Sequence, residues 1–189
     1  MKRVLVLLAP GFEEIEAVTV IDLLRRAKIQ VVTAGTQGVQ VTGSHQITLV
    51  AETTLAQLGD QSFDMLVLPG GMPGAKNLQL DDRVIQWVRT MHDQFHWIGA
   101  ICAAPMVLGK AGVLEGLRAT SYPGFLEAFP EVRKVKDPVV VDQSIITARG
   151  PGVAIDFALR LIEVLCGRSK HDQIEASLQR DASIAVREE

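Results

Sequence analysis

The chain has 189 residues, a formal net charge of −3 and 48% hydrophobic residues. A chain of this length buries enough surface in one core to fold without a disulfide or a structural metal, so we expect one domain over residues 1–189. The weakly acidic balance argues against nucleic-acid binding, which needs a basic patch or stripe. The apolar run at residues 4–9 is too short for a membrane span or for the apolar core of a signal peptide. We therefore expect a cytoplasmic protein with no membrane attachment and no sequence-specific nucleic-acid partner.

Short runs rich in Val, Ile and Leu, closed by turn residues, predict buried strands. In chain order these runs cover residues 3–8, 29–34, 65–68, 97–101, 139–141 and 145–148. Residues 39–51 alternate loosely around Thr42, Gly43 and Ser44 and resemble a hairpin.

Helical patterns alternate with these strands. They cover residues 12–27, 81–91, 102–108, 153–166 and 169–178, and Asp81 or Asp82 caps the second of them. Continuous apolar strands alternating with helices indicate an α/β fold, in which a mostly parallel sheet is covered on both faces. The polar end at residues 180–189 is expected to fray.

Cys102 directly follows the predicted strand at residues 97–101 and begins the next predicted helix. In such a sheet, ligands bind beyond the carboxyl ends of the strands, so side chains at these ends are the first candidates for chemistry. A thiol at a helix N-terminus meets free N–H groups and the helix dipole, which favour the thiolate, and the bend resembles a nucleophile elbow. The alternative is a small buried hydrophobic residue, which is what most free cysteines are.

Cys166 has the pattern of a core residue. Together with Ile155, Leu159 and Ile162 it falls at spacings of four, three and four on one face of a helix. We therefore expect Cys166 to be buried in the core. Because the sequence shows no secretory signal, both cysteines are expected to be reduced thiols.

Glu16 is an anomaly in the helix at residues 12–27. The other members of its helical stripe are all apolar: Phe12, Val20, Leu23 and Ala27. Desolvation in such a stripe raises the pKa of a carboxyl, so that Glu16 holds a proton near neutral pH and donates it to a neighbouring anion. The alternative is that Glu16, like Glu13 and Glu14, only adds negative charge near the helix start, which the dipole favours.

Gly70 and Gly71 follow the strand at residues 65–68. Their backbone N–H groups are able to receive an oxyanion, although paired glycines also serve simply as turns. Neither Pro10-Gly11 nor Gly150-Pro151-Gly152 has the spacing of a phosphate-binding glycine loop. The histidines lack metal-ligand spacing with Cys or carboxylates, so no metal site is expected, and we interpret His92 and His96 as solvent-facing.

Four segments recur in an order and spacing that span nearly the whole chain: LAPGFEEIEAVTVIDLLRRA, VLPGGMPGAKNL, AICAAP and ARGPGVAIDFALRLIEVLCG. Together they resemble the ThiJ/PfpI superfamily, in the branch of the Parkinson-associated human protein deglycase and its bacterial YajL-type relatives. The resemblance implies a flavodoxin-like three-layer sandwich with a mostly parallel sheet, helices on both faces and a small β-hairpin. It also implies a homodimer, with no metal or organic cofactor.

Matching positions give roles to individual residues. The resemblance implies that Cys102 is the family's oxidisable nucleophile and that Glu16 is the protonated glutamate that hydrogen-bonds it. Gly71 falls on the glycine whose backbone amide lines the same pocket. Ala103 supplies the next backbone N–H at the elbow.

One position departs from the pattern. Tyr122, before Pro123, stands where many relatives carry a histidine, so that a complete Cys–His pair is missing. Gly70 and Tyr122 are assigned to the pocket, as is Arg26, which matches a family arginine near the entrance on the dimer side. His45 stands where the human relative has an arginine.

Two functions from different classes follow. The first is a stress-response hydrolase of deglycase type, which repairs methylglyoxal or glyoxal adducts on proteins or nucleotides. In it Cys102 attacks the adduct carbonyl, Glu16 relays a proton, and the amides of Gly71 and Ala103 hold the oxyanion. The second is a redox-sensing chaperone without significant turnover, in which oxidation of Cys102 changes the binding of client proteins. The missing histidine favours the second function, and protease activity is the least supported.

Overall fold

A seven-stranded sheet forms the centre of the computed structural model, which describes residues 1–180. The strands lie in the order β10-β11-β7-β6-β1-β2-β5, and every neighbouring pair is parallel except β10 with β11. Their bounds are β1 (Arg3–Leu8), β2 (Gln30–Gly35), β5 (Thr53–Thr54), β6 (Met65–Leu68), β7 (Trp97–Ile101), β10 (Val139–Asp142) and β11 (Ile145–Ala148).

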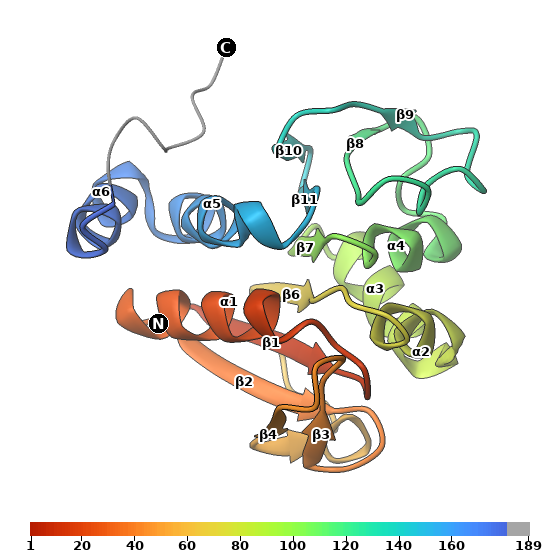
Figure 1. Cartoon of the computed structure of the whole chain (residues 1–189), viewed down its shortest axis with the longest axis horizontal. Helices are drawn as coiled ribbons and strands as arrows, with labels where there is room; N and C mark the ends of the chain where they lie inside the picture. The colour runs from red at the N-terminus through yellow and green to blue at the C-terminus, as the bar shows by residue number, and fades with distance from the viewer. Residues whose placement is uncertain (181–189) are drawn as a thin grey trace.

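Helices cover both faces of this sheet (Figure 1). One layer holds α1 (Glu14–Arg26), α5 (Ala154–Cys166) and α6 (Arg168–Ser177), and the other holds α2 (Gly74–Leu80), α3 (Asp82–Asp93) and α4 (Pro105–Ala111). In the first layer α1 packs against α5 and α5 against α6, while in the second the three helices pack against one another. The predicted flavodoxin-like sandwich is confirmed.

The apolar runs in the sequence arise because the central strands are buried on both sides. Along β1, Val4 and Val6 belong to the core under α1 and α5, whereas Leu5 and Leu7 belong to the core on the opposite face. Side chains of a strand alternate between faces, so a strand between two helical layers needs apolar residues at every position.

Short elements complete the fold. β3 (Gln40–Thr42) and β4 (Thr48–Val50) form the predicted antiparallel hairpin, and β8 (Arg118–Ala119) pairs with β9 (Arg133–Lys134) in a second small sheet. The 3₁₀ turns are η1 (Leu55–Gln57) and η2 (Pro151–Val153). Within residues 1–180, no helix has both the length and the apolar character needed to cross a membrane.

Helix starts differ from prediction by a few residues. Asp81 caps α3, because its side chain accepts a hydrogen bond from the Arg83 N–H at 3.0 Å. The helix expected from residue 102 begins only at Pro105, a residue whose fixed φ suits the first turn of a helix.

Arg180 is the last residue that the structure describes. Arg180 is held in place, because its guanidinium donates hydrogen bonds to Asp156 and, at 3.4 Å, to Glu175. The expectation that the polar end frays stays a prediction. The remainder of the predicted tail, residues 181–189, lies outside the described residues.

Candidate active site

Cys102 lies at a sharp bend between β7 and α4. Its φ of 61° is in the left-handed region, which residues other than glycine rarely adopt. Two backbone hydrogen bonds of 2.8 Å hold the bend: the Cys102 N–H donates to the Ala148 carbonyl, and the Tyr122 N–H donates to the Cys102 carbonyl. Cys102 is only 9% exposed, so a small reagent meets a largely buried thiol. This strained, fixed bend is the geometry of a nucleophile elbow.

Glu16 lies in the first turn of α1, three residues after the cap residue Glu13, and its side chain is completely buried. Its Oε2 accepts a hydrogen bond from the Gly70 N–H at 2.7 Å, whereas its Oε1 has no hydrogen bond within the described part of the chain. Burial raises the pKa of Glu16 to about 7, although the Gly70 N–H and the Cys102 thiol both act to lower it. The carboxyl is therefore able to gain or lose a proton near neutral pH.

Gly70 brings the carboxyl and the cysteine together. A Cβ at this position would lie 2.7 Å from the Cys102 Cβ and 2.8 Å from Glu16 Oε2, closer than real atoms approach. The Cys102 Cβ and Glu16 Oε2 are consequently no more than about 5.5 Å apart. Glycine is required here because any side chain would separate the two groups.

The thiol of Cys102 resists ionisation. Burial, followed by the charge of an ionised Glu16, raises the pKa of Cys102 to about 12, against the lowering effect of the Gly71 and Ala103 N–H groups. The expectation that the elbow favours a standing thiolate is therefore wrong. α4 has only seven residues and starts three positions after Cys102, so that its dipole is too weak and too distant to offset burial.

Cys102 and Glu16 instead titrate as a coupled pair. Near pH 7 the carboxyl loses its proton first, because its pKa is the lower of the two. The carboxylate then lies beside the thiol as a proton acceptor, and a base whose pKa is near the working pH is well matched to that task. The geometry thus allows a thiolate to form at the moment when sulfur attacks an electrophile.

Gly71 and Ala103 add backbone donors at the sulfur. Both N–H groups interact with Cys102 strongly enough to act against the rise in its pKa. Gly71 has a φ of 83°, and a Cβ there would crowd the backbone of Phe12 at 2.8 Å. These two donors are suited to stabilise negative charge on sulfur or on an oxygen bound beside it.

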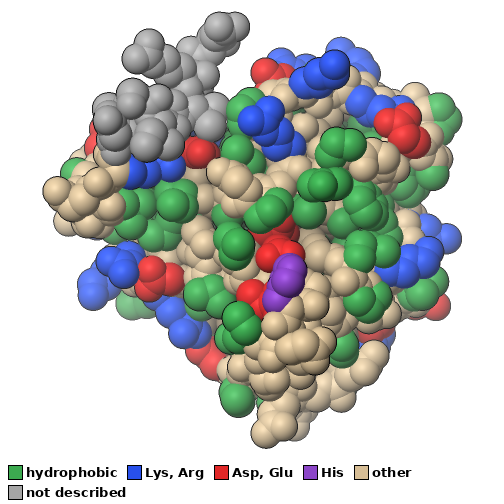
Figure 2. Space-filling view, viewed as in Figure 1, with side chains coloured by type: hydrophobic (Ala, Val, Ile, Leu, Met, Phe, Trp, Pro, Cys, Tyr) green, Lys and Arg blue, Asp and Glu red, His purple; other side chains and the backbone are tan. Residues whose placement is uncertain are grey.

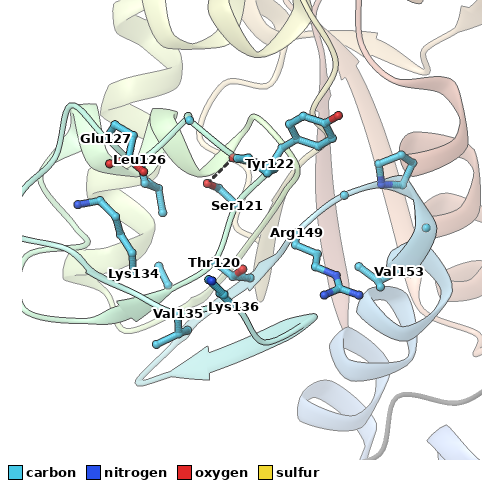
Figure 3. Close-up of a pocket in the computed structure, with 16 residues that line it drawn as sticks. Thr120, Ser121, Tyr122, Leu126, Glu127, Lys134, Val135, Lys136, Arg149 and Val153 are labelled. Atoms are coloured by element: carbon cyan, nitrogen blue, oxygen red, sulfur yellow. Dashed lines mark hydrogen bonds between the residues drawn. The ribbon is translucent and has the colours of Figure 1, made fainter.

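Tyr122 forms part of the wall next to this site. The residue is 49% exposed, and its ring packs edge to face on Phe125, with 6.3 Å between the ring centroids. A Cβ at Gly150 would lie 3.4 Å from the Tyr122 ring, so that the loops carrying the two residues are in contact. Both loops line a cavity of about 780 Å³ (Figure 3).

Arg26 is not brought to the site. It is at the C-terminal end of α1, ten residues beyond Glu16, which at the helical rise corresponds to about 15 Å along the axis. Its Nε donates to Asp22 at 2.7 Å in an exposed ion pair. Within a single chain Arg26 therefore lies away from Cys102 and Glu16, and its assignment to the pocket entrance on the dimer side stays a prediction.

Two further residue interpretations are corrected. Cys166 is exposed, because it is the last residue of α5 and the apolar stripe of this helix ends at Leu165 before reaching it. His92 and His96 are half-buried instead of solvent-facing, and the His92 Nδ1 is buried without a hydrogen bond within residues 1–180.

Glu14 has a structural role that the sequence pattern did not reveal. It is 5% exposed, and its Oε1 accepts hydrogen bonds from the N–H groups of His45 (2.7 Å) and Ile47 (3.3 Å). Burial alone would raise the pKa of Glu14, but hydrogen bonds from the His45 side chain and from these N–H groups lower it to about 2. The pKa of His45 is raised in return, chiefly by its hydrogen bond to Glu14. Glu14 thus fastens the β3–β4 hairpin to the start of α1.

Two clusters of side chains have metal-ligand atoms within 4.8 Å of one another: Glu13, Glu14 and His45, and His171, Asp172 and Glu175. In the first cluster Glu14 and His45 are hydrogen-bonded to each other at 3.0 Å. In the second, Asp172 accepts hydrogen bonds from His171 and Arg168, each at 2.8 Å. Ion pairs and hydrogen bonds account for both clusters, and the absence of a metal site stays a prediction.

The fold and the elbow define an α/β protein with a buried cysteine paired to a buried carboxyl. The chain belongs to the DJ-1/PfpI family, whose family model matches residues 2–164. It is 41% identical to Protein dj-1beta of Drosophila melanogaster, over 94% of this chain and 96% of the relative. The crystal structure of Drosophila DJ-1beta superposes with a TM-score of 0.92 at 40% identity, covering 95% of this chain and 98% of the other.

Two other relatives bear on function. A Caenorhabditis elegans protein named glutathione-independent glyoxalase DJR-1.2 is 32% identical, over 92% of this chain and 94% of the relative. The structure of Toxoplasma gondii DJ-1, described as oxidized, has a TM-score of 0.90 at 38% identity and covers 94% of this chain and 98% of that one. The predicted family membership is confirmed.

Proposed function

We propose that this protein is a cysteine-dependent enzyme of deglycase type, which converts the adducts of methylglyoxal or glyoxal on proteins or nucleotides into a hydroxy acid and the repaired group. The observation that carries the proposal is the pairing of Cys102 at the elbow with Glu16, whose pKa is raised by burial to about 7. The similarity to a relative named as a glyoxalase supports a substrate of the α-oxoaldehyde class.

In the proposed reaction, ionised Glu16 takes the Cys102 proton while Sγ attacks the adduct carbonyl. The N–H groups of Gly71 and Ala103 stabilise the oxyanion that forms when the carbonyl π electrons move to oxygen. A hydrogen then shifts with its electron pair from the carbon that carries the adduct to the carbon bonded to Sγ, and the Sγ–C bond breaks. The first carbon is thereby oxidised to the acid level and the second is reduced to an alcohol. Cys102 leaves as a thiolate and takes its proton back from Glu16. One water molecule is consumed, and the repaired nucleophile leaves with a proton. The balance requires no external oxidant or reductant.

Lactate release tests this proposal. A methylglyoxal-treated thiol or guanosine is incubated with the wild type, Cys102→Ser and Cys166→Ser, in the presence and absence of a scavenger of free methylglyoxal. We expect release by the wild type and by Cys166→Ser, and loss of release in Cys102→Ser. Equal release by all three proteins would remove the enzymatic function. Release that the scavenger abolishes would assign the activity to free methylglyoxal instead of the adduct.

We propose as a second candidate function a redox-sensing chaperone, in which oxidation of Cys102 changes the binding of client proteins. Tyr122 stands where the resemblance implies a histidine, and the similar structure of Toxoplasma gondii DJ-1 is described as oxidized. Hydrogen peroxide converts a thiolate to sulfenic acid, and a second equivalent gives sulfinic acid, which Glu16 and the neighbouring N–H groups are placed to bind. Client binding that rises with the mass gain at Cys102, without lactate release, would favour this function over the enzyme.

We propose further that the protein acts as a homodimer in the cytoplasm. Exposed apolar side chains gather on α1 and the hairpin (Figure 2), among them Ile15 (57% exposed), Val18 (45%), Ile47 (54%) and Val50 (72%). Several exposed apolar side chains on one face of a protein are typical of an interface. Both cysteines are free, which suits a reducing compartment. Sedimentation at twice the chain mass supports the dimer, and a monomer at all concentrations would exclude it.

A further inference from the structure

The cavity of about 780 Å³ beside the Tyr122 loop is distinct in character from the Cys102 site. Lys134 reaches it from the end of β9, Lys136 from the segment that follows, and Arg149 from the residue after β11 (Figure 3). Three exposed cations, two from one stretch of chain and one from another, therefore line one hollow. Within the described part of its lining, Glu127 is the one acidic side chain.

The charge of this lining contrasts with the rest of the molecule. Three cations and one carboxylate give the lining a net charge of +2, whereas the whole chain has a net charge of −3. Within residues 1–180, none of the three cationic side chains makes a hydrogen bond or an ion pair, while other arginines such as Arg25 and Arg83 are paired with carboxylates. Unpaired cations around a concave surface attract an anion.

The remaining walls suit the body of an organic molecule. Ala119, Leu126 and Val153 are buried apolar residues on the lining, and the Tyr122 ring stands at the rim with a flat face. A volume of about 780 Å³ is in the usual range for small-molecule sites and exceeds the need of a bare inorganic ion. The hydroxyl-bearing Thr120, 3% exposed, adds a polar group to the cationic part.

We infer that this cavity binds a small phosphate monoester with a flat, apolar body. A phosphate monoester carries close to two negative charges at neutral pH, which matches the net charge of the lining. Arg149 offers a planar fork for two phosphate oxygens, and the lysines add point charges. Recognition by side-chain cations needs no glycine loop, and none with phosphate-binding spacing is present in the sequence.

The site goes beyond the proposed chemistry at Cys102 and does not depend on it. Its two walls are anchored to the elbow, because the Tyr122 N–H donates to the Cys102 carbonyl and the Cys102 N–H donates to Ala148, the residue before Arg149. Cys102 itself is not part of the lining. Binding in the cavity should therefore persist when the thiol is replaced.

Calorimetric titration with adenosine 5′-monophosphate, adenosine and inorganic phosphate tests the inference on the full-length protein. We expect the monophosphate to bind at least about tenfold more tightly than either fragment, because hydrogen bonds to charged groups are worth a factor of ten or more each. Affinity for the monophosphate should fall as ionic strength rises. Equal affinity for adenosine, or for inorganic phosphate, would overturn the inference.

Variants locate the binding. Lys134→Gln with Lys136→Gln, and separately Arg149→Gln, should each weaken the monophosphate by about tenfold or more, with unfolding temperatures checked for each. Lys110→Gln is the matched control, because Lys110 is an exposed lysine on α4 outside the lining. Cys102→Ser should bind like the wild type. Loss of binding in Cys102→Ser, or the same affinity in the cavity variants as in Lys110→Gln, would contradict a site in this cavity.

Discussion

Replacing Glu16 by Leu should lower the pKa of the Cys102 thiol. In the wild type, burial and the charge of Glu16 raise that pKa to about 12. Two unit charges at about 5.5 Å, the upper limit for the distance between the Cys102 Cβ and Glu16 Oε2, interact by about 3 kcal/mol at an effective dielectric constant of about 20. This energy corresponds to about two pKa units. Leucine removes this charge but keeps the site apolar, so the Cys102 pKa should fall to about 10 and remain above the usual thiol value because burial persists.

An ultraviolet titration of the thiolate measures this shift. Wild type and Glu16→Leu are compared in a Cys166→Ala background, which removes the signal of the second cysteine. Glu16→Gln serves as a neutral control that keeps a hydrogen-bond donor. A rise of the Cys102 pKa in Glu16→Leu would refute the reasoning, because it would mean that Glu16 stays protonated and stabilises a thiolate. An unchanged pKa would place Glu16 out of electrostatic reach of the sulfur.

Three further predictions follow from burial. Gly70→Ala should lower the free energy of unfolding by about 1–3 kcal/mol, because the added Cβ overpacks the site. Gly38→Ala is the control and should lower it far less, because a Cβ at Gly38 has open space around it. Equal losses in denaturant titrations would contradict this prediction. Because the pKa of Glu16 is raised to about 7, the folded wild type keeps a proton that the unfolded chain loses above about pH 4.5. The free energy of unfolding of the wild type, relative to that of Glu16→Leu, should therefore fall by about 3 kcal/mol between pH 4.5 and 7. A difference that stays constant with pH would argue against a raised pKa. A bulky maleimide should label the exposed Cys166 before the 9% exposed Cys102, and peptide mapping that shows the reverse order would mean that the elbow is open.

The sequence was informative about the fold wherever burial of a strand on both faces leaves a continuous apolar run. β6, β7 and β11 coincide with the predicted runs, since strands buried on both faces are apolar at nearly every position; Thr147 in β11 is the polar exception. β5, β8 and β9 have two residues each, too few for any periodicity to show. α2 is seven residues long and lacks an N-terminal side-chain cap, so it has neither the length nor the start signal of a predictable helix.

The candidate site was only partly accessible to pattern analysis. Glu16 stood out because a carboxyl in an apolar stripe is unusual, and the structure shows it completely buried. Glu14 did not stand out, because its partners His45 and Ile47 come from a hairpin about thirty residues away. The sign of the Cys102 shift was also missed, since it depends on three-dimensional burial and on the distance to Glu16.

The central claim is that Cys102 attacks the adduct while Glu16 accepts its proton. The most direct test is to measure the rate of lactate formation from methylglyoxal adducts as a function of pH. The account predicts a rate that rises with pH and levels off through an inflection near pH 7, which reports the ionisation of Glu16. Glu16→Gln should lose this inflection, and Cys102→Ser should lose the reaction, with Cys166→Ser behaving as the wild type. Lactate formation that survives in Cys102→Ser, or the same inflection near pH 7 in Glu16→Gln, would contradict the account.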